Sequence, residues 1–107
     1  NRVFFATNRS TLTTAARATL RKQATYLRKN KKLNVTIEGH ADERGTREYN
    51  LALGERRANA AKDYLMTYGI SGKRISVISY GKEKPVNTAS SALAWSQNRR
   101  SVTVKVN

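Results

Sequence analysis

Residues 39–59 read GHADERGTREYNLALGERRAN, and this stretch predicts the end of a strand, a loop and the start of a helix. Before it, residues 33–38 alternate apolar and polar side chains, which is the period of a half-buried strand. That strand is expected to end at Gly39 or His40, and the loop to occupy residues 41–45. The stretch therefore joins a strand to a helix through a short loop rich in charged side chains.

Thr46 is the expected N-cap of the helix, because its hydroxyl can accept a hydrogen bond from an amide of the first turn. Glu48 suits the positive end of the helix dipole, and Gly69 followed by Ile70 is typical of a helix end. Between these ends an apolar stripe recurs at helical spacing, formed by Tyr49, Leu53, Ala60, Ala61, Tyr64 and Leu65.

The remaining elements follow from the same patterns. We expect strands at residues 3–5, 75–79 and 102–106, a helix over roughly 12–29, and a short helix over 90–98 with Trp95 as its core anchor. The order β-α-β-α-β-α-β predicts an α/β two-layer sandwich, with a four-stranded mixed sheet and helices mainly on one face. One domain over residues 1–107 is expected.

Composition limits the classes of function. The chain has 21 Lys and Arg against 7 Asp and Glu, a formal net charge of +14, which attracts polyanions such as nucleic acid, anionic lipid headgroups or an acidic wall polymer. It has no Cys and one His, so no metal site is expected, and no nucleophile-bearing turn or phosphate-binding loop is present in the sequence. We expect no enzyme activity and no cofactor.

Nucleic-acid binding is the alternative function that the charge allows. Seven of the basic residues fall between Arg17 and Lys32: five on the solvent face of the first helix, and Lys31 and Lys32 just after it. The aromatic residues, however, recur at positions typical of a core and form no stacking platform on one strand. A basic nucleic-acid-binding domain therefore stays open as the second hypothesis.

Helical geometry brings several residues of the opening stretch to one face. Asn50, Leu53 and Arg57 lie three and four residues apart, whereas Arg56 points elsewhere. Asp42 lies in the preceding loop, so an acid and a base can flank one pocket, which suits a zwitterionic ligand. The alternative is that Asp42 and Arg57 simply pair with each other, or with Arg44 and Glu38, and stabilise the loop.

Three segments carry a resemblance over essentially the whole chain. Residues 39–65, 78–85 (ISYGKEKP) and 96–104 (SQNRRSVTV) resemble the OmpA C-terminal-like domain family, most closely its branch of peptidoglycan-associated lipoproteins. The resemblance implies a non-catalytic domain that binds peptidoglycan non-covalently through the meso-diaminopimelate of the stem peptide.

The resemblance also implies roles for individual residues. The family's ammonium-binding Asp is matched by Asp42, and its carboxylate-binding Arg by Arg57. Ala6-Thr7-Asn8 replaces the acidic and aromatic residues of many members, so backbone contacts are expected there. The further pocket residues implied are Ala6, Thr7, Asn8, Asn50 and Leu53.

Partners and location are likewise implied by the resemblance alone. Members belong to the Tol-Pal system of envelope integrity and cell division, and bind TolB through a surface overlapping the peptidoglycan-binding mouth. They are held at the periplasmic face of the Gram-negative outer membrane by a lipidated Cys. Since the chain contains no Cys, such an anchor is expected outside it. Peptidoglycan and the Tol proteins, with no nucleic acid, are the partners expected.

Overall fold

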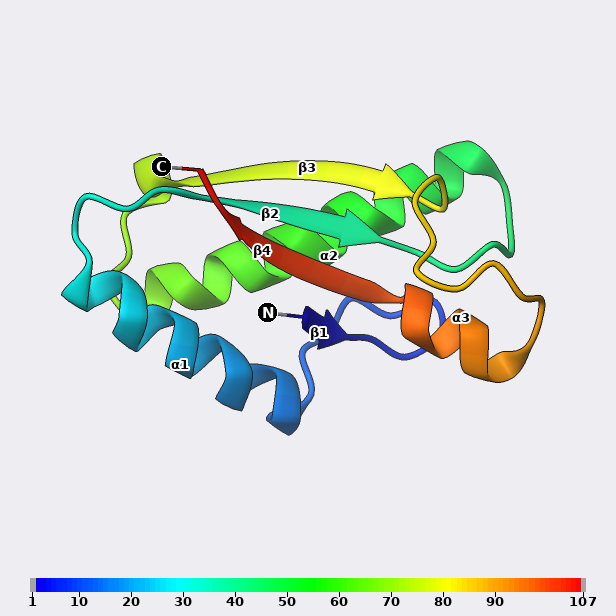
Figure 1. Cartoon of the computed structure of the whole chain (residues 1–107), viewed down its shortest axis with the longest axis horizontal. Helices are drawn as coiled ribbons and strands as arrows, with labels where there is room; N and C mark the ends of the chain where they lie inside the picture. The colour runs from blue at the N-terminus through cyan, green and yellow to red at the C-terminus, as the bar shows by residue number, and fades with distance from the viewer. Residues whose placement is uncertain (1, 107) are drawn as a thin grey trace.

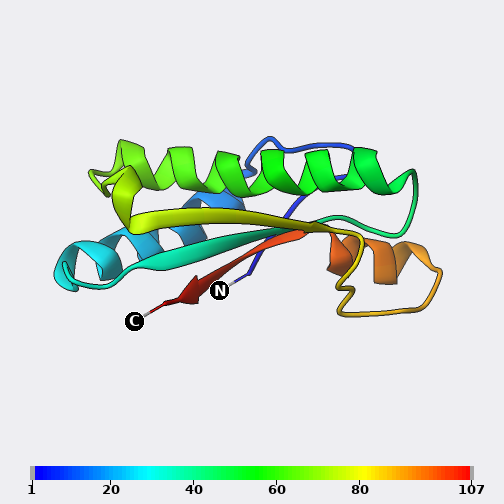
Figure 2. The same cartoon turned by 90° about the horizontal axis from the view of Figure 1, so that it is seen from above.

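A computed structural model describes residues 2–106 and consists of a four-stranded sheet with two long helices on one of its faces (Figure 1 and Figure 2). Asn1 and Asn107, the limits of the expected domain, lie outside the described residues. The elements are β1 (Arg2–Phe4), α1 (Thr14–Lys29), β2 (Val35–His40), α2 (Arg47–Thr67), the 3-10 helix η1 (Gly72–Arg74), β3 (Ile75–Gly81), α3 (Ala92–Asn98) and β4 (Arg100–Lys105).

The strand order in the sheet is β1-β4-β2-β3. β2 and β3 are parallel, as the crossover through α2 requires, whereas β4 is antiparallel to both of its neighbours. The predicted mixed sheet, with its helices mainly on one face, is confirmed. The last strand is inserted between β1 and β2, a placement that spacing along the chain does not predict.

The two long helices begin at threonine caps. Thr46 Oγ1 accepts a hydrogen bond from the Tyr49 amide over 3.1 Å, so the predicted cap of α2 is confirmed. Thr13 caps α1 in the same way, through the Ala16 amide at 3.1 Å, so α1 begins later than the expected residue 12. Neither α1, α2 nor α3 is both long and apolar enough to cross a membrane.

The buried face of α2 differs from the predicted apolar stripe. Leu53, Ala61 and Leu65 are buried as expected, but Tyr49 is 43% exposed. Asn50 and Arg57 are buried instead, because Asn50 donates to carbonyls of the loop before α2 and Arg57 donates to the His40 carbonyl at the end of β2. The buried set on α2 is Asn50, Leu53, Gly54, Arg57, Ala58, Ala61 and Leu65.

Two glycines allow α2 to lie directly on β2. A Cβ on Gly39 would collide with the backbone carbonyl of Gly54, and a Cβ on Gly54 would collide with the Ser79 hydroxyl. The two backbones are therefore in contact at this point. The contact fixes the position of α2 relative to the loop that follows β2.

Several element ends differ from the predictions. β2 begins at Val35, because the Leu33 amide is used in a turn to the Asn30 carbonyl. β3 continues to Gly81, two residues further than expected, and β4 begins two residues earlier, at Arg100.

Trp95 is only half buried and is absent from the apolar core cluster, so its prediction as a core anchor is wrong. Ala94 and Asn98 are the buried residues of α3.

Candidate functional site

Arg57 occupies a fully buried position at the centre of the candidate site. Its guanidinium donates to three backbone carbonyls: Nε to Arg9 (2.9 Å), Nη1 to His40 (2.9 Å) and Nη2 to Ala6 (3.1 Å). Its exposed fraction is 0%. Burial lowers the pKa of Arg57 to about 10, so the side chain remains a cation at neutral pH. Arg57 thus joins α2 to the loop after β1 and to the end of β2.

Asp42 lies just beyond β2 and is also buried. Its Oδ1 accepts hydrogen bonds from the backbone amide (3.0 Å) and Nε (3.2 Å) of Arg44, and its Oδ2 accepts from Arg44 Nη2 (2.8 Å) and Arg99 Nη1 (3.3 Å). Burial pushes the pKa of Asp42 upward, but the hydrogen bonds from Arg44 and Arg99 outweigh burial and lower it. Asp42 is therefore a carboxylate at neutral pH.

Asp42 and Arg57 share the site without pairing. Within residues 2–106 no salt bridge joins them, and Asp42 pairs with Arg44 and Arg99 instead. Of the loop-stabilising pairs left open, the structure contains Asp42–Arg44, and among the described residues neither Asp42 nor Glu38 forms a salt bridge with Arg57. Burial lowers the pKa of Arg57, but the two charges are close enough that the Asp42 carboxylate partly offsets this lowering.

The loop after β1 forms one wall of the site. Ala6 contributes its carbonyl to Arg57, and Thr7 Oγ1 accepts from Arg44 Nη2 over 3.2 Å. Asn8 has a φ of 54°, and its Oδ1 accepts from the Tyr49 hydroxyl over 3.3 Å. The structure therefore brings these three expected residues together with Arg44 and Arg57.

Asn50 and Leu53 lie on the buried face of α2. Asn50 Nδ2 donates to the carbonyls of Arg44 (2.7 Å) and Thr46 (2.9 Å), which holds the loop between β2 and α2 in place. The Leu53 side chain is 3% exposed. Both residues lie where helical spacing predicts, on the same side of α2 as Arg57.

Two further arginines belong to the site: Arg44, expected only as a loop-stabilising partner of Asp42, and Arg99, which no pattern in the sequence indicates. Arg44 lies over the Trp95 ring, with its Cζ 4.2 Å from the ring centroid, and its side chain is 40% exposed. Arg99 also donates through Nε to the Phe5 carbonyl over 2.8 Å. Arg44 carried a local signal, its position two residues after Asp42, whereas Arg99 is distant in sequence.

His40 is the last residue of β2, one of the two expected ends of that strand, and its ring is held by two neighbouring side chains. Its Nε2 lies 3.3 Å from Glu38 Oε1, and its ring stacks on Tyr80 with centroids 5.5 Å apart. Burial, helped by the positive charge of Arg100, lowers the pKa of His40 to about 4. Across the described residues no three His, Asp or Glu side chains converge as a metal site would require.

Comparisons with known proteins agree on one family. The OmpA family profile matches residues 4–99. The peptidoglycan-associated lipoprotein of Rhizobium meliloti (strain 1021) is 57% identical over 104 residues, which cover 97% of this chain and 59% of that protein. The chain thus spans about three fifths of that curated relative.

Solved structures show the same fold. The crystal structure of the peptidoglycan-associated lipoprotein from Burkholderia pseudomallei matches with a TM-score of 0.95 at 37% identity, covering 98% of this chain and 89% of that one. The C-terminal domain of Helicobacter pylori MotB matches with a TM-score of 0.91 at 18% identity, covering 100% of this chain and 84% of that one, a likeness of fold alone.

Proposed function

The chain belongs to the OmpA family, and from that premise we propose that it binds peptidoglycan non-covalently and links the outer membrane to the cell wall. Relatives named peptidoglycan-associated lipoprotein, 57% and 52% identical over nearly the whole chain, support this proposal. The domain acts as a binding module and not as an enzyme, and residues 1–107 form that one module.

The ligand group is the side-chain end of meso-diaminopimelate, which carries an ammonium and a carboxylate on one carbon. Asp42 receives the ammonium and Arg57 the carboxylate, each through charge-assisted hydrogen bonds. The observation that carries this assignment is that two buried, opposite charges share one site without pairing with each other. A zwitterion can satisfy both charges at once.

Ligand entry requires Arg44 to leave Asp42. The Arg44 side chain occupies both carboxylate oxygens but is 40% exposed, so it can turn into solvent while the buried Asp42 stays in place. The ammonium of the ligand then takes the place of the Arg44 guanidinium, so Asp42 keeps a cationic partner. Arg99, with a side chain 13% exposed, remains as the second partner of Asp42.

Access to Arg57 requires a shift of the loop after β1. Three of the five guanidinium N–H groups are used by carbonyls, which leaves one N–H on each of Nη1 and Nη2 for a carboxylate. Residues 6–9 are exposed and cover the guanidinium. Ala6, Thr7 and Asn8 therefore line the mouth through their backbone, while Asn50 and Leu53 hold its helical wall.

The wider setting belongs to the same proposal. The chain is the wall-binding part of a protein anchored by lipid to the periplasmic face of the outer membrane, and it works with TolB and the other Tol proteins in envelope integrity and cell division. Repeated stem peptides give a high effective concentration, so modest affinity at each site suffices.

Binding to isolated sacculi of the diaminopimelate type tests the proposal. Asp42→Asn keeps the shape of the side chain but removes the charge, and should weaken binding about tenfold or more, because a hydrogen bond to a charged group contributes about 1.5–3 kcal/mol. Glu43→Gln, at an exposed acid that accepts from Ser90, is the matched control and should bind like the parent. Equal binding by Asp42→Asn and the parent would refute the assignment.

A further inference from the structure

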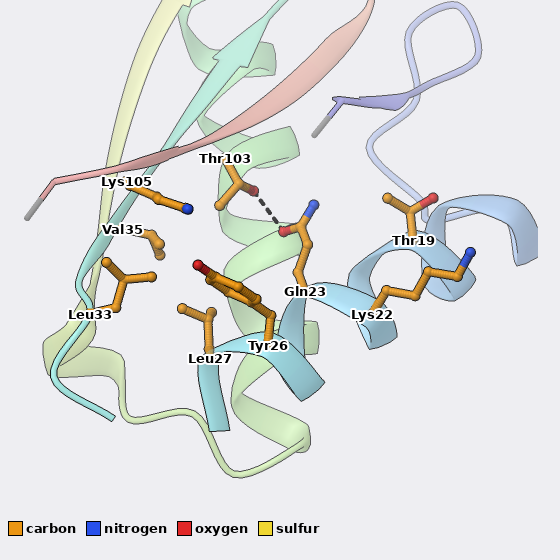
Figure 3. A pocket seen from close by; sticks show the side chains of 9 residues that line it. All are labelled: Thr19, Lys22, Gln23, Tyr26, Leu27, Leu33, Val35, Thr103 and Lys105. Carbon is orange, nitrogen blue, oxygen red and sulfur yellow. Dashed lines mark hydrogen bonds between the residues drawn. The ribbon is translucent and has the colours of Figure 1, made fainter. Parts of the chain in front are cut away.

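The candidate site is closed in this structure. Asp42 is 6% exposed and Arg57 is 0% exposed. The groove between α1 and β4 in Figure 3, with a volume of about 320 Å³, contains none of the candidate site residues. A ligand therefore reaches Asp42 and Arg57 only after a side chain and a loop have moved.

The Arg44 side chain covers Asp42. Its Nε and Nη2 donate to the two carboxylate oxygens, over 3.2 Å and 2.8 Å. The Arg44 backbone is fixed, because its amide donates to Asp42 Oδ1 over 3.0 Å and its carbonyl accepts from Asn50 Nδ2 over 2.7 Å. Only the side chain of Arg44 can leave, and its guanidinium is a cation in the position proposed for the ammonium of the ligand.

The same guanidinium holds the loop that covers Arg57. The Nη2 that bonds Asp42 also donates to Thr7 Oγ1 over 3.2 Å. Thr7 belongs to residues 6–9, whose carbonyls at both ends accept from Arg57. One side chain therefore joins the buried acid to the segment that covers the buried base.

Arg44 is the partner of Asp42 that is able to move. Its side chain is 40% exposed, and one face of its guanidinium packs on Trp95, with Cζ 4.2 Å from the ring centroid. Arg99 makes a comparable pair of contacts, to Asp42 and to the Phe5 carbonyl, but its side chain is 13% exposed. An ion pair in contact with solvent separates at a small cost in free energy, whereas a buried pair does not.

We propose that the Arg44 side chain is a latch that keeps both halves of the site closed and lowers the affinity for the ligand, an inference that rests on the proposed binding of meso-diaminopimelate. When the ammonium displaces Arg44 from Asp42, the bond to Thr7 is lost as well, and the loop can uncover Arg57. Only chains with the latch open bind, so the apparent affinity falls with the fraction that is open. Loss of the latch should therefore strengthen binding, whereas loss of a merely structural residue would weaken it.

Three stem peptides that differ only at the third residue test the latch. This residue is meso-diaminopimelate, lysine or α-aminopimelate, so its side chain ends in both charges, in an ammonium alone or in a carboxylate alone. Arg44→Ala should lower the Kd of all three peptides about threefold at neutral pH, because the cost of opening is common to them. Loss of a cation would by charge alone weaken binding of the α-aminopimelate peptide, so tighter binding of this peptide distinguishes the latch from a simple charge effect.

A matched control and a measurement without ligand accompany the titrations. Arg47→Ala breaks an exposed pair with Glu83 instead, and should leave the three Kd values unchanged. The Arg9 amide donates to the Ala6 carbonyl over 3.1 Å within the covering loop. Arg44→Ala should speed hydrogen exchange at this amide, since the loop opens more often once it is released.

Thr7→Val tests whether the two contacts of the latch are coupled. It keeps the shape of the side chain but removes the acceptor for Arg44, so it should lower the Kd of the α-aminopimelate peptide about twofold. Arg44→Ala added to Thr7→Val should then lower this Kd by less than the product of the two separate factors. Fully independent effects would overturn the coupling.

The remaining outcomes separate this proposal from the proposed function. Unchanged or weaker binding of the diaminopimelate peptide by Arg44→Ala, with binding by the parent intact, overturns the latch alone. Tighter binding confined to the diaminopimelate and lysine peptides also overturns it, because Arg44 would then compete at Asp42 without controlling access to Arg57. Absence of binding by both the parent and Arg44→Ala would refute the proposed function together with the latch.

Discussion

Arg57 Nη1 donates to the His40 carbonyl over 2.9 Å, and this bond ties the middle of α2 to the end of β2 beside Asp42. The same guanidinium holds the loop after β1 through the carbonyls of Ala6 and Arg9. Arg57 is thus both the proposed carboxylate ligand and a structural centre of the fold. Its substitution should affect stability as well as binding.

Arg57→Ala should lower the free energy of unfolding by about 3 kcal/mol or more, because three carbonyls lose their donor and a buried volume is vacated. Arg56→Ala is the matched control on the exposed face of α2 and should change it by less than about 0.5 kcal/mol. Urea unfolding at neutral pH measures both. A loss below about 1 kcal/mol for Arg57→Ala would contradict the structural role.

Arg44→Ala should raise the pKa of Asp42. Burial favours the neutral carboxyl, and at present the hydrogen bonds from Arg44 outweigh it, so their removal leaves burial opposed only by Arg99. Carboxyl-carbon NMR titration of Asp42 measures the change. Arg47→Ala, which breaks a pair with Glu83 instead, should leave the Asp42 titration as it is in the parent. An unchanged Asp42 pKa in Arg44→Ala would show that Arg44 does not hold the carboxylate.

His40 should make the domain less stable in mild acid. Its pKa is about 4 in the folded chain and about 6.5 in the unfolded chain, so between these values the unfolded chain binds more protons and stability falls as pH falls. The expected loss from pH 7 to pH 5 is about 1–2 kcal/mol. His40→Gln should remove most of this slope, as measured by urea unfolding at both pH values. A parent chain equally stable at pH 7 and pH 5 would rule out a buried neutral His40.

Gly54→Ala should destabilise the domain by about 3 kcal/mol or more, because a Cβ there collides with the Ser79 hydroxyl and crowds the Gly39 backbone. Gly69→Ala is a useful comparison: its φ is 88° and no atom lies near the added Cβ, so the cost there comes from backbone conformation alone and should be about 1 kcal/mol. Thermal unfolding compares the two. An equal effect at both positions would argue against close contact between α2 and β2.

Much of the fold is predictable because its signals are local. Thr46 and Gly69 mark the ends of α2 through backbone chemistry confined to a few residues, and the alternation before Gly39 marks β2. The insertion of β4 between β1 and β2 depends on pairing between the two ends of the chain, and no local sequence pattern predicts this pairing.

The site is only partly predictable for a similar reason. Helical spacing brings Asn50, Leu53 and Arg57 to one face, and the structure agrees. The complete burial of Arg57 could not be predicted, since arginine is rarely buried and its partners are carbonyls of distant segments. Arg99 reaches Asp42 only because α3 and β4 return beside β2.

The measurement that tests the central claim most directly is a titration with two muropeptides that differ only at the third residue of the stem, meso-diaminopimelate in one and lysine in the other. The lysine peptide keeps the ammonium for Asp42 but lacks the carboxylate for Arg57. The diaminopimelate peptide should bind about tenfold or more tightly, and should shift the amide resonances of residues 6–9. Equal affinity for the two peptides would contradict the pairing of Arg57 with the ligand carboxylate.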